Sequence, residues 1–356
     1  MLRRSDTADR PGRVFRPGFL ASQIATILAA LSLYSALSAA QQPPAAPPQP
    51  PSQSKADGDY RLKVETSLVV LHATVTDKDS KPVADLKQDE FKVFENNVEQ
   101  KIKIFKREDI PVSVGIIVDN SGSMRDKRRG VNAAAVKFVR SSNEKDEVFI
   151  VNFNEESFLD AEFTDSIPLL EEALEKIDSR GGTALYDALD MSLQHITESA
   201  SLDKRVLILI TDGEDDASRI SLEQLIENVG HSNVMIYTVG LLSGEGGRAT
   251  RRAKRALEEI SRASGGIVYF PKDPDDVLAV ATSIANDIRN QYVIAYTPAN
   301  LSRDGGFRKV EVRVNAPKRG RLNVRTRTGY YAEASPPADT AAKPAQPPAA
   351  SQSGSL

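Results

Sequence analysis

One short stretch of the sequence combines a carboxylate and two hydroxyls at a spacing that suits a metal ion. Asp119, Ser121 and Ser123 occupy alternate positions directly after the apolar run 112–118. Alternate side chains that follow a buried strand can converge on one point. They offer only oxygen atoms, which hard cations such as Mg2+ or Mn2+ prefer as ligands. The spacing therefore predicts a divalent-metal site at the end of this run.

Two later segments are placed to complete this site. Thr183 opens a helical pattern, and we expect its hydroxyl at the N-cap of that helix. Asp212 follows the apolar run 206–210 within a Thr-Asp-Gly triplet. Ligands of open α/β sheets bind beyond the carboxyl ends of the strands, where Asp119 and Asp212 would both lie. A simpler interpretation is that Ser121 and Ser123 only cap the helix that follows them and that Asp212 caps the next one.

The elements that must position these residues alternate between strand and helix patterns over residues 109–290. The run 112–118 is apolar and rich in β-branched residues, which is typical of a strand buried on both faces. Such alternation predicts an α/β fold with a doubly wound, mostly parallel sheet and helices on both faces. The expected strands are 112–118, 147–153, 205–211, 233–239 and 267–270. The expected helices are 126–141, 166–178, 184–199, 221–229, 250–264 and 274–290.

The segments on either side of this α/β region have the two-residue period of β-strands instead. Residues 60–108 alternate apolar and polar positions and contain turn signals, and residues 291–332 do the same. We predict that the strands of both segments pair with one another. They would form one small β-sandwich-like domain that is split around the α/β domain.

The two ends of the chain have a different composition. Residues 1–40 combine a basic leader, the apolar stretch 19–37 and small residues before Gln41, which predicts a Sec-type signal peptide and a secreted or periplasmic protein. An uncleaved N-terminal membrane anchor is the alternative. Residues 41–58 form a Pro-rich linker, and residues 333–356 have a similar composition. Both segments lack apolar residues to bury and are expected to be disordered.

The five predicted ligands together resemble a known metal motif. The motif is the metal-ion-dependent adhesion site (MIDAS) of von Willebrand factor type A (VWFA) domains, and the residues that match it are Asp119, Ser121, Ser123, Thr183 and Asp212. The resemblance extends over about residues 109–290. It implies a Rossmann-like fold and a bound Mg2+ (or Mn2+ or Ca2+). It also implies that the cation bridges to an Asp or Glu carboxylate of a protein partner, as in cell adhesion.

The flanking segments resemble those of a secreted bacterial family seen especially in acidobacteria. The resemblance is carried by the strand sequence 91–95 (FKVFE), by residues 292–298 and 306–309, and by the Gly-Tyr-Tyr triplet 329–331. This family implies a fold and a location outside the cytoplasm, but no settled molecular function.

Several function classes lack their sequence signals. The chain has no Cys and a formal net charge of −3, so thiolate sites are excluded and no strong polyelectrolyte partner is indicated. Its basic clusters lack interleaved aromatic residues, so we expect no nucleic-acid binding. HExxH, GxSxG and P-loop motifs are missing, so we expect no enzyme. A Mg2+-dependent hydrolase that uses the same acids, and a scaffold with a vestigial metal site, are the alternatives. No pattern indicates an oligomeric state.

Further charged residues near the predicted site have a simple interpretation. Residues 214–216 are all acidic and are expected to form a solvated loop. The basic run 127–129 is adequately explained as a solvated helix face. It would nevertheless lie near the metal, where it could attract an acidic partner.

Overall fold

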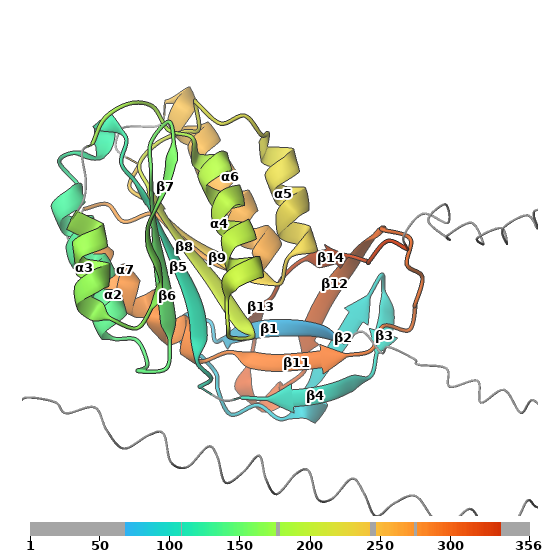
Figure 1. Ribbon diagram of the computed structural model, residues 1–356. Helices are drawn as coiled ribbons and strands as arrows, with labels where there is room; N and C mark the ends of the chain where they lie inside the picture. The colour runs from blue at the N-terminus through green and yellow to red at the C-terminus, as the bar shows by residue number, and fades with distance from the viewer. Residues whose placement is uncertain (1–67, 108, 176–178, 243–246, 274–275, 336–356) are drawn as a thin grey trace, which may run out of the picture. The chain divides into compact units, whose positions relative to one another are not determined.

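The computed structural model describes residues 68–107, 109–175, 179–242, 247–273 and 276–335 (Figure 1). The predicted signal peptide, the Pro-rich linker and residues 336–356 of the predicted tail lie outside these ranges. Within them, no helix is both long enough and apolar enough to cross a membrane. The strands of this part of the chain form one six-stranded sheet and two four-stranded antiparallel sheets.

The six-stranded sheet has the order β10-β9-β8-β5-β6-β7. Its strands are β5 (Val112–Asp119), β6 (Glu147–Phe153), β7 (Ser157–Thr164), β8 (Lys204–Thr211), β9 (Val234–Gly240) and β10 (Val268–Tyr269). β7 is antiparallel to β6, whereas the other neighbours pair in parallel. Every residue of β5 is buried, because the strand has a neighbour on each side and helices over both faces. The predicted α/β class with a mostly parallel sheet is confirmed.

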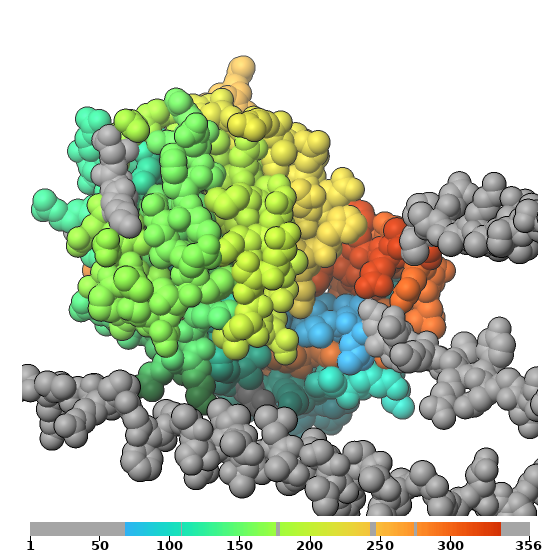
Figure 2. All heavy atoms as spheres, viewed as in Figure 1, coloured from blue at the N-terminus to red at the C-terminus, as the bar shows by residue number. Residues whose placement is uncertain are grey.

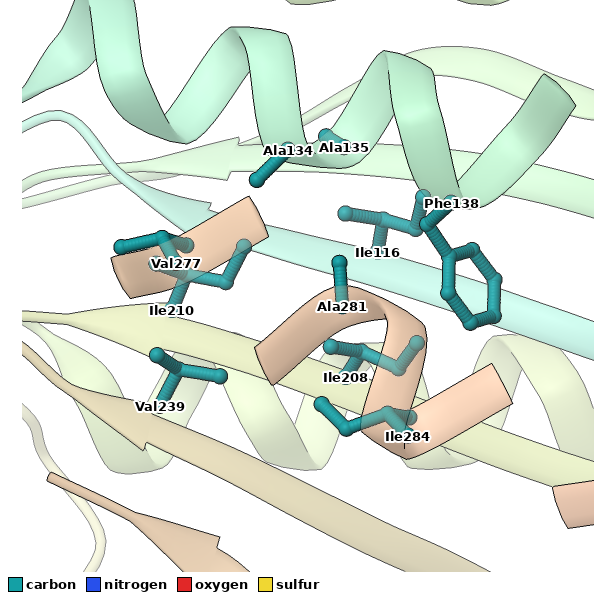
Figure 3. Close-up of a pocket in the computed structure, with 10 residues that line it drawn as sticks. All are labelled: Ile116, Ala134, Ala135, Phe138, Ile208, Ile210, Val239, Val277, Ala281 and Ile284. Atoms are coloured by element: carbon teal, nitrogen blue, oxygen red, sulfur yellow. The ribbon is translucent and has the colours of Figure 1, made fainter. Parts of the chain in front are cut away.

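In the part of the chain that the structure describes, six helices cover the two faces of this sheet (Figure 1). They are α2 (Arg128–Arg140), α3 (Ile167–Glu175), α4 (Leu185–Ser199), α5 (Leu222–His231), α6 (Arg248–Ser264) and α7 (Val277–Arg289). Helices α2, α3 and α7 share one apolar cluster with the sheet, and α4, α5 and α6 share the other. Figure 3 shows part of the first cluster, where Ile116 and Ile208 of the sheet line one pocket together with Phe138 of α2 and Ile284 of α7.

One strand of this sheet was not among the predicted elements. β7 lies at the edge of the sheet and pairs only with β6 among the described strands. Its side chains do not alternate cleanly between buried and exposed, and Phe158 and Leu159 are both exposed. An edge strand needs to bury less of its surface, so its two-residue period is weak. The other strands and helices of the α/β region begin and end within about three residues of their predicted bounds.

The two antiparallel sheets each combine strands from before and after the α/β region. One sheet has the order β13-β1-β11-β4, and the other has the order β14-β12-β2-β3. The early strands are β1 (Val69–Thr76), β2 (Phe91–Glu95), β3 (Val98–Gln100) and β4 (Ile102–Lys106). The late strands are β11 (Tyr292–Tyr296), β12 (Phe307–Val314), β13 (Asn323–Arg325) and β14 (Gly329–Tyr331). In Figure 2 the blue surface of β1 lies beside the orange and red surface of these late strands.

A shared apolar core joins the two antiparallel sheets. Leu71 of β1, Phe91 of β2, Tyr292 of β11 and Val312 of β12 all belong to one buried cluster. The rings of Phe91 and Tyr292 are 5.0 Å apart between centroids. Two sheets that bury a common apolar layer form a sandwich.

A buried polar cluster connects this sandwich to the α/β region. The guanidinium of Arg325 on β13 donates to Oδ2 of Asp287 on α7 at 2.6 Å and to Oγ1 of Thr74 at 3.0 Å. The hydroxyl of Tyr237 on β9 donates to the same Asp287 oxygen at 2.5 Å. The carboxylate is therefore shared by groups from both parts of the chain, which joins α7 to the sandwich.

Candidate metal site

Asp119 is the last residue of β5, and its side chain is buried at the carboxyl edge of the sheet. Its Oδ1 accepts a hydrogen bond from the backbone N–H of Ser121 at 2.7 Å. Its Oδ2 accepts one from the hydroxyl of Thr211 at 2.6 Å. Burial raises the pKa of Asp119 above its ordinary value, although both hydrogen bonds act in the opposite direction. A carboxylate oxygen has two lone pairs, so each oxygen retains one for a further ligand.

The two serines connect Asp119 to Asp212. Ser123 lies on the short 3-10 helix η2 (Gly122–Met124), and its hydroxyl donates to Oδ1 of Asp212 at 2.8 Å. The Ser121 and Ser123 hydroxyl oxygens are 3.1 Å apart. Because the Ser123 proton is directed at Asp212, the Ser121 hydroxyl is the donor of that contact. Both serine oxygens keep a lone pair that can bind a cation.

Thr183 reaches the same edge of the sheet from a separate loop. The backbone N–H of Gly122 donates to the carbonyl of Gly181 at 3.3 Å, so this loop is bonded to the turn after β5. Gly181 has a φ of +74°, a conformation that glycine adopts without strain. The Thr183 hydroxyl lies beside Gly213, where an added Cβ would be 3.4 Å from it. Hydrogen bonds thus link Asp119, Ser121, Ser123 and Asp212 at this edge of the sheet, and Thr183 lies beside Gly213, the residue that follows Asp212.

The predicted role of Thr183 as an N-cap is wrong. Helix α4 begins at Leu185, and its N-cap is Ala184. The Thr183 backbone N–H instead donates to Oδ1 of Asp216 at 2.7 Å, and its carbonyl accepts from the N–H of Asp216 at 3.0 Å. This reciprocal pair holds Thr183 just outside the helix.

The acidic loop after Asp212 is more than the solvated segment that was expected. Besides Asp216, the carboxylate of Asp215 accepts from the N–H of Tyr186 at 3.2 Å. Glu155, in the turn between β6 and β7, accepts from the N–H of Gly182 at 3.0 Å. Three carboxylates therefore fix the backbone around Thr183. No motif in the sequence indicated Glu155, because its partner lies in a different loop.

The start of α2 places two cations against the site. The Lys127 ammonium lies 2.5 Å from Oδ2 of Asp212, and 16% of the Lys127 side chain and 1% of the Asp212 side chain are exposed. Arg128 is buried and donates to the backbone carbonyl of Asp119 at 3.3 Å. Burial lowers the pKa of Arg128 to about 10. The interpretation of this run as a solvated helix face is wrong for Lys127 and Arg128, and Arg129 is exposed.

The oxygen atoms gathered here fit a hard divalent cation. Carboxylates and hydroxyls are the ligand types that Mg2+ accepts, and Mg2+ usually keeps several waters as well. No group of three or more His, Cys, Asp or Glu side chains among the described residues could hold a metal. A cation at this edge would therefore depend on the serine and threonine hydroxyls as well as on the two acids.

The chain is similar to several proteins of known structure. The structure of a von Willebrand factor type A protein from Catenulispora acidiphila is 15% identical and covers 76% of this chain and 75% of its own, with a TM-score of 0.44. The vWF domain of a type V pili tip protein from Porphyromonas gingivalis is 14% identical and covers 50% of this chain and 95% of its own, with a TM-score of 0.42.

An uncharacterized protein of Borreliella burgdorferi is 25% identical over 198 residues, which are 48% of this chain and 58% of that protein. The match thus spans a little over half of the relative's length. The family model of the von Willebrand factor type A domain matches residues 113–283. This segment contains the six-stranded sheet except for Val112, the first residue of β5, and it contains all the predicted metal ligands. Residues 113–283 of this chain form a von Willebrand factor type A domain.

Proposed function

We propose that this protein is a metal-dependent binding protein that works outside the cytoplasm, as a secreted or periplasmic protein. Its type A domain holds a divalent cation, with Mg2+ as the first choice and Mn2+ or Ca2+ as alternatives. The ligands are Asp119, Ser121, Ser123, Thr183 and Asp212. The cation supplies electrostatic attraction for an Asp or Glu carboxylate of a protein partner. The sandwich built from residues 60–108 and 291–332 carries this domain as an insertion.

The observation that supports the cation most directly is the hydrogen-bond chain from Asp119 to Asp212. Ser121 donates to Ser123, and Ser123 donates to Asp212 at 2.8 Å. Each hydroxyl proton is thereby turned toward the next oxygen, so the remaining lone pairs are available to one cation. Hydroxyl ligands carry no charge and do not neutralise the ion, which favours an anionic group as the next ligand.

The hydrogen bonds also favour binding over catalysis. A general base needs a carboxylate oxygen within reach of a substrate proton. Both oxygens of Asp119 accept hydrogen bonds, and the lone pair that each oxygen retains is taken by the cation in this proposal. Asp212 accepts from Ser123 and Lys127. Neither acid is positioned as a free base. The hydrolase remains the alternative that an activity screen would identify.

A calorimetric titration with Mn2+ tests the cation site. The wild-type protein should bind one equivalent of Mn2+. Asp119→Ala should lose binding, because it removes the buried carboxylate at the end of β5 that accepts from the backbone N–H of Ser121. Asp203→Ala, which changes an exposed acid in the turn before β8, is the matched control and should bind as the wild type does. Equal affinity of the wild type and Asp119→Ala would show that the cation site is wrongly assigned.

Cross-linking in an envelope extract tests the bridge to a partner. A partner held through the cation should be captured by the wild type, and lost both with EDTA and with Asp119→Ala. Replacing one Asp or Glu of the captured partner should have the same effect. Capture that survives chelation contradicts the bridging mechanism. A phosphatase and esterase screen of the same samples tests the hydrolase, whose turnover should require Asp119.

A further inference from the structure

Lys127 occupies a position that the helix itself disfavours. It is the N-cap residue of α2, and the first turn continues with Arg128 and Arg129 and contains no acidic residue. The N-terminus of a helix carries a partial positive charge, so cations there are destabilising. A lysine at this position needs a compensating interaction. For Lys127, the carboxylate of Asp212 provides it.

The pair between Lys127 and Asp212 is held in a fixed geometry. The backbone N–H of Lys127 donates to the carbonyl of Met124 at 2.9 Å, and its own carbonyl accepts from Val131 at 3.1 Å. Asp212 is almost fully buried, with Ser123 on Oδ1 and the ammonium on Oδ2. The positive charge is therefore a built-in part of the site.

We propose that Lys127 sets the charge of the metal site, so that it weakens cation binding and strengthens the binding of a carboxylate to the bound cation. This inference rests on the proposed function. The two carboxylates Asp119 and Asp212 contribute −2, and Lys127 and Arg128 contribute +2, which leaves 0. A divalent cation brings this sum to +2, which attracts a partner's carboxylate. Without Lys127 the sum would be +1, and that attraction would be weaker.

A purely structural ion pair would behave differently. Its removal would lower the stability of the protein and would not change the two affinities in opposite directions. The opposite changes follow only if the ammonium acts on the cation through its charge. The two affinities together therefore distinguish the two roles.

The test uses Lys127→Met, which keeps most of the aliphatic stem and removes the charge. Lys127→Arg keeps the charge, and Lys137→Met removes an exposed lysine from the same helix as a matched control. Mn2+ affinity is measured by calorimetry. Acetate, the simplest carboxylate, is then titrated into Mn2+-saturated protein, and its binding is followed by water-proton relaxation. Thermal melting establishes that each variant is folded.

We expect Lys127→Met to bind Mn2+ about tenfold more tightly and acetate about tenfold more weakly, as the loss of a unit charge close to the ion implies. Lys127→Arg and Lys137→Met should remain near the wild type in both titrations. If the wild type binds Mn2+ and Lys127→Met binds it no more tightly, or holds acetate equally well, the inference is overturned and the cation site stands. If the wild type binds no Mn2+, the proposed function fails, and this inference fails with it. If Lys127→Met does not fold, an unchanged Lys127→Arg supports the charge role, and a Lys127→Arg variant that loses Mn2+ overturns it.

Discussion

His72 provides a direct test of the contacts between β1 and the α/β region. It is buried within β1, and its Nδ1 has no hydrogen-bond partner among the described residues. Burial lowers the pKa of His72 from 6.5 to about 3, with further lowering by the charges of Lys204 and Arg327. The folded protein therefore keeps this imidazole neutral at acidic pH. The unfolded chain takes up the proton near pH 6.5.

The sign of the pH effect follows from these two values. Because the folded pKa is the lower one, the contribution of His72 to stability is complete above pH 6.5 and is lost as the pH falls toward 3. Within that window the loss is about 1.4 kcal/mol per pH unit. Between pH 7 and pH 5 the free energy of unfolding should fall by about 2 kcal/mol because of this residue alone.

Urea unfolding at pH 7, 6 and 5 measures this effect in the wild type and in His72→Gln, which keeps a polar side chain without the titration. The difference between the two free energies of unfolding should change by about 2 kcal/mol across the range. His231→Gln, which changes an exposed histidine at the end of α5, is the control and should show the wild-type slope. If the wild-type and His72→Gln curves run parallel, the reasoning about the buried imidazole is wrong.

Three further changes test packing, charge and the Thr183 loop. Gly266→Ala would place a Cβ 2.0 Å from a backbone carbonyl oxygen of β9, so thermal melting should show a loss of about 2 kcal/mol or more. In Gly247→Ala the added Cβ would make only an ordinary contact, 3.8 Å from the Thr250 hydroxyl, so this variant should be near neutral. Arg325→Met leaves the buried Asp287 carboxylate without its cation, so the free energy of unfolding in urea should fall by about 3 kcal/mol or more. If the variant were as stable as the wild type, the buried polar cluster would not stabilise the protein. Asp216→Ala removes the carboxylate that accepts from the Thr183 N–H, so the Mn2+ affinity measured by calorimetry should fall about tenfold. An unchanged affinity would mean that other contacts hold the Thr183 loop.

The parallel sheet could be predicted because its central strands leave a strong pattern. The run 112–118 is apolar on both faces, and that pattern requires helices on both sides of a strand. The edge strand β7 leaves no such pattern, since Phe158 and Leu159 are exposed on a strand with acidic neighbours. Strand burial, more than strand propensity, decides which strands a sequence reveals.

The metal site, too, could be predicted from the sequence only in part. Residues at strand ends, such as Asp119 and Asp212, could be placed together because parallel neighbours end at the same edge. The contacts of Glu155 and Lys127 join residues that are 27 and 85 positions apart, along loop paths that no local pattern encodes. A run of basic residues does not reveal which of them is turned inward. The contacts of Glu155 and Lys127 can therefore be identified only from the structure.

The pairing of β1 with β11 bears on how the chain is made. His72 lies opposite Val293, so the first strand must wait for more than two hundred further residues before its partner has been synthesised. During that interval β1 presents unpaired backbone groups, while the intervening type A segment can already collapse around its own sheet. Contacts between residues so distant in sequence form slowly. A nascent chain of this design is therefore prone to aggregation until its last strands have been synthesised.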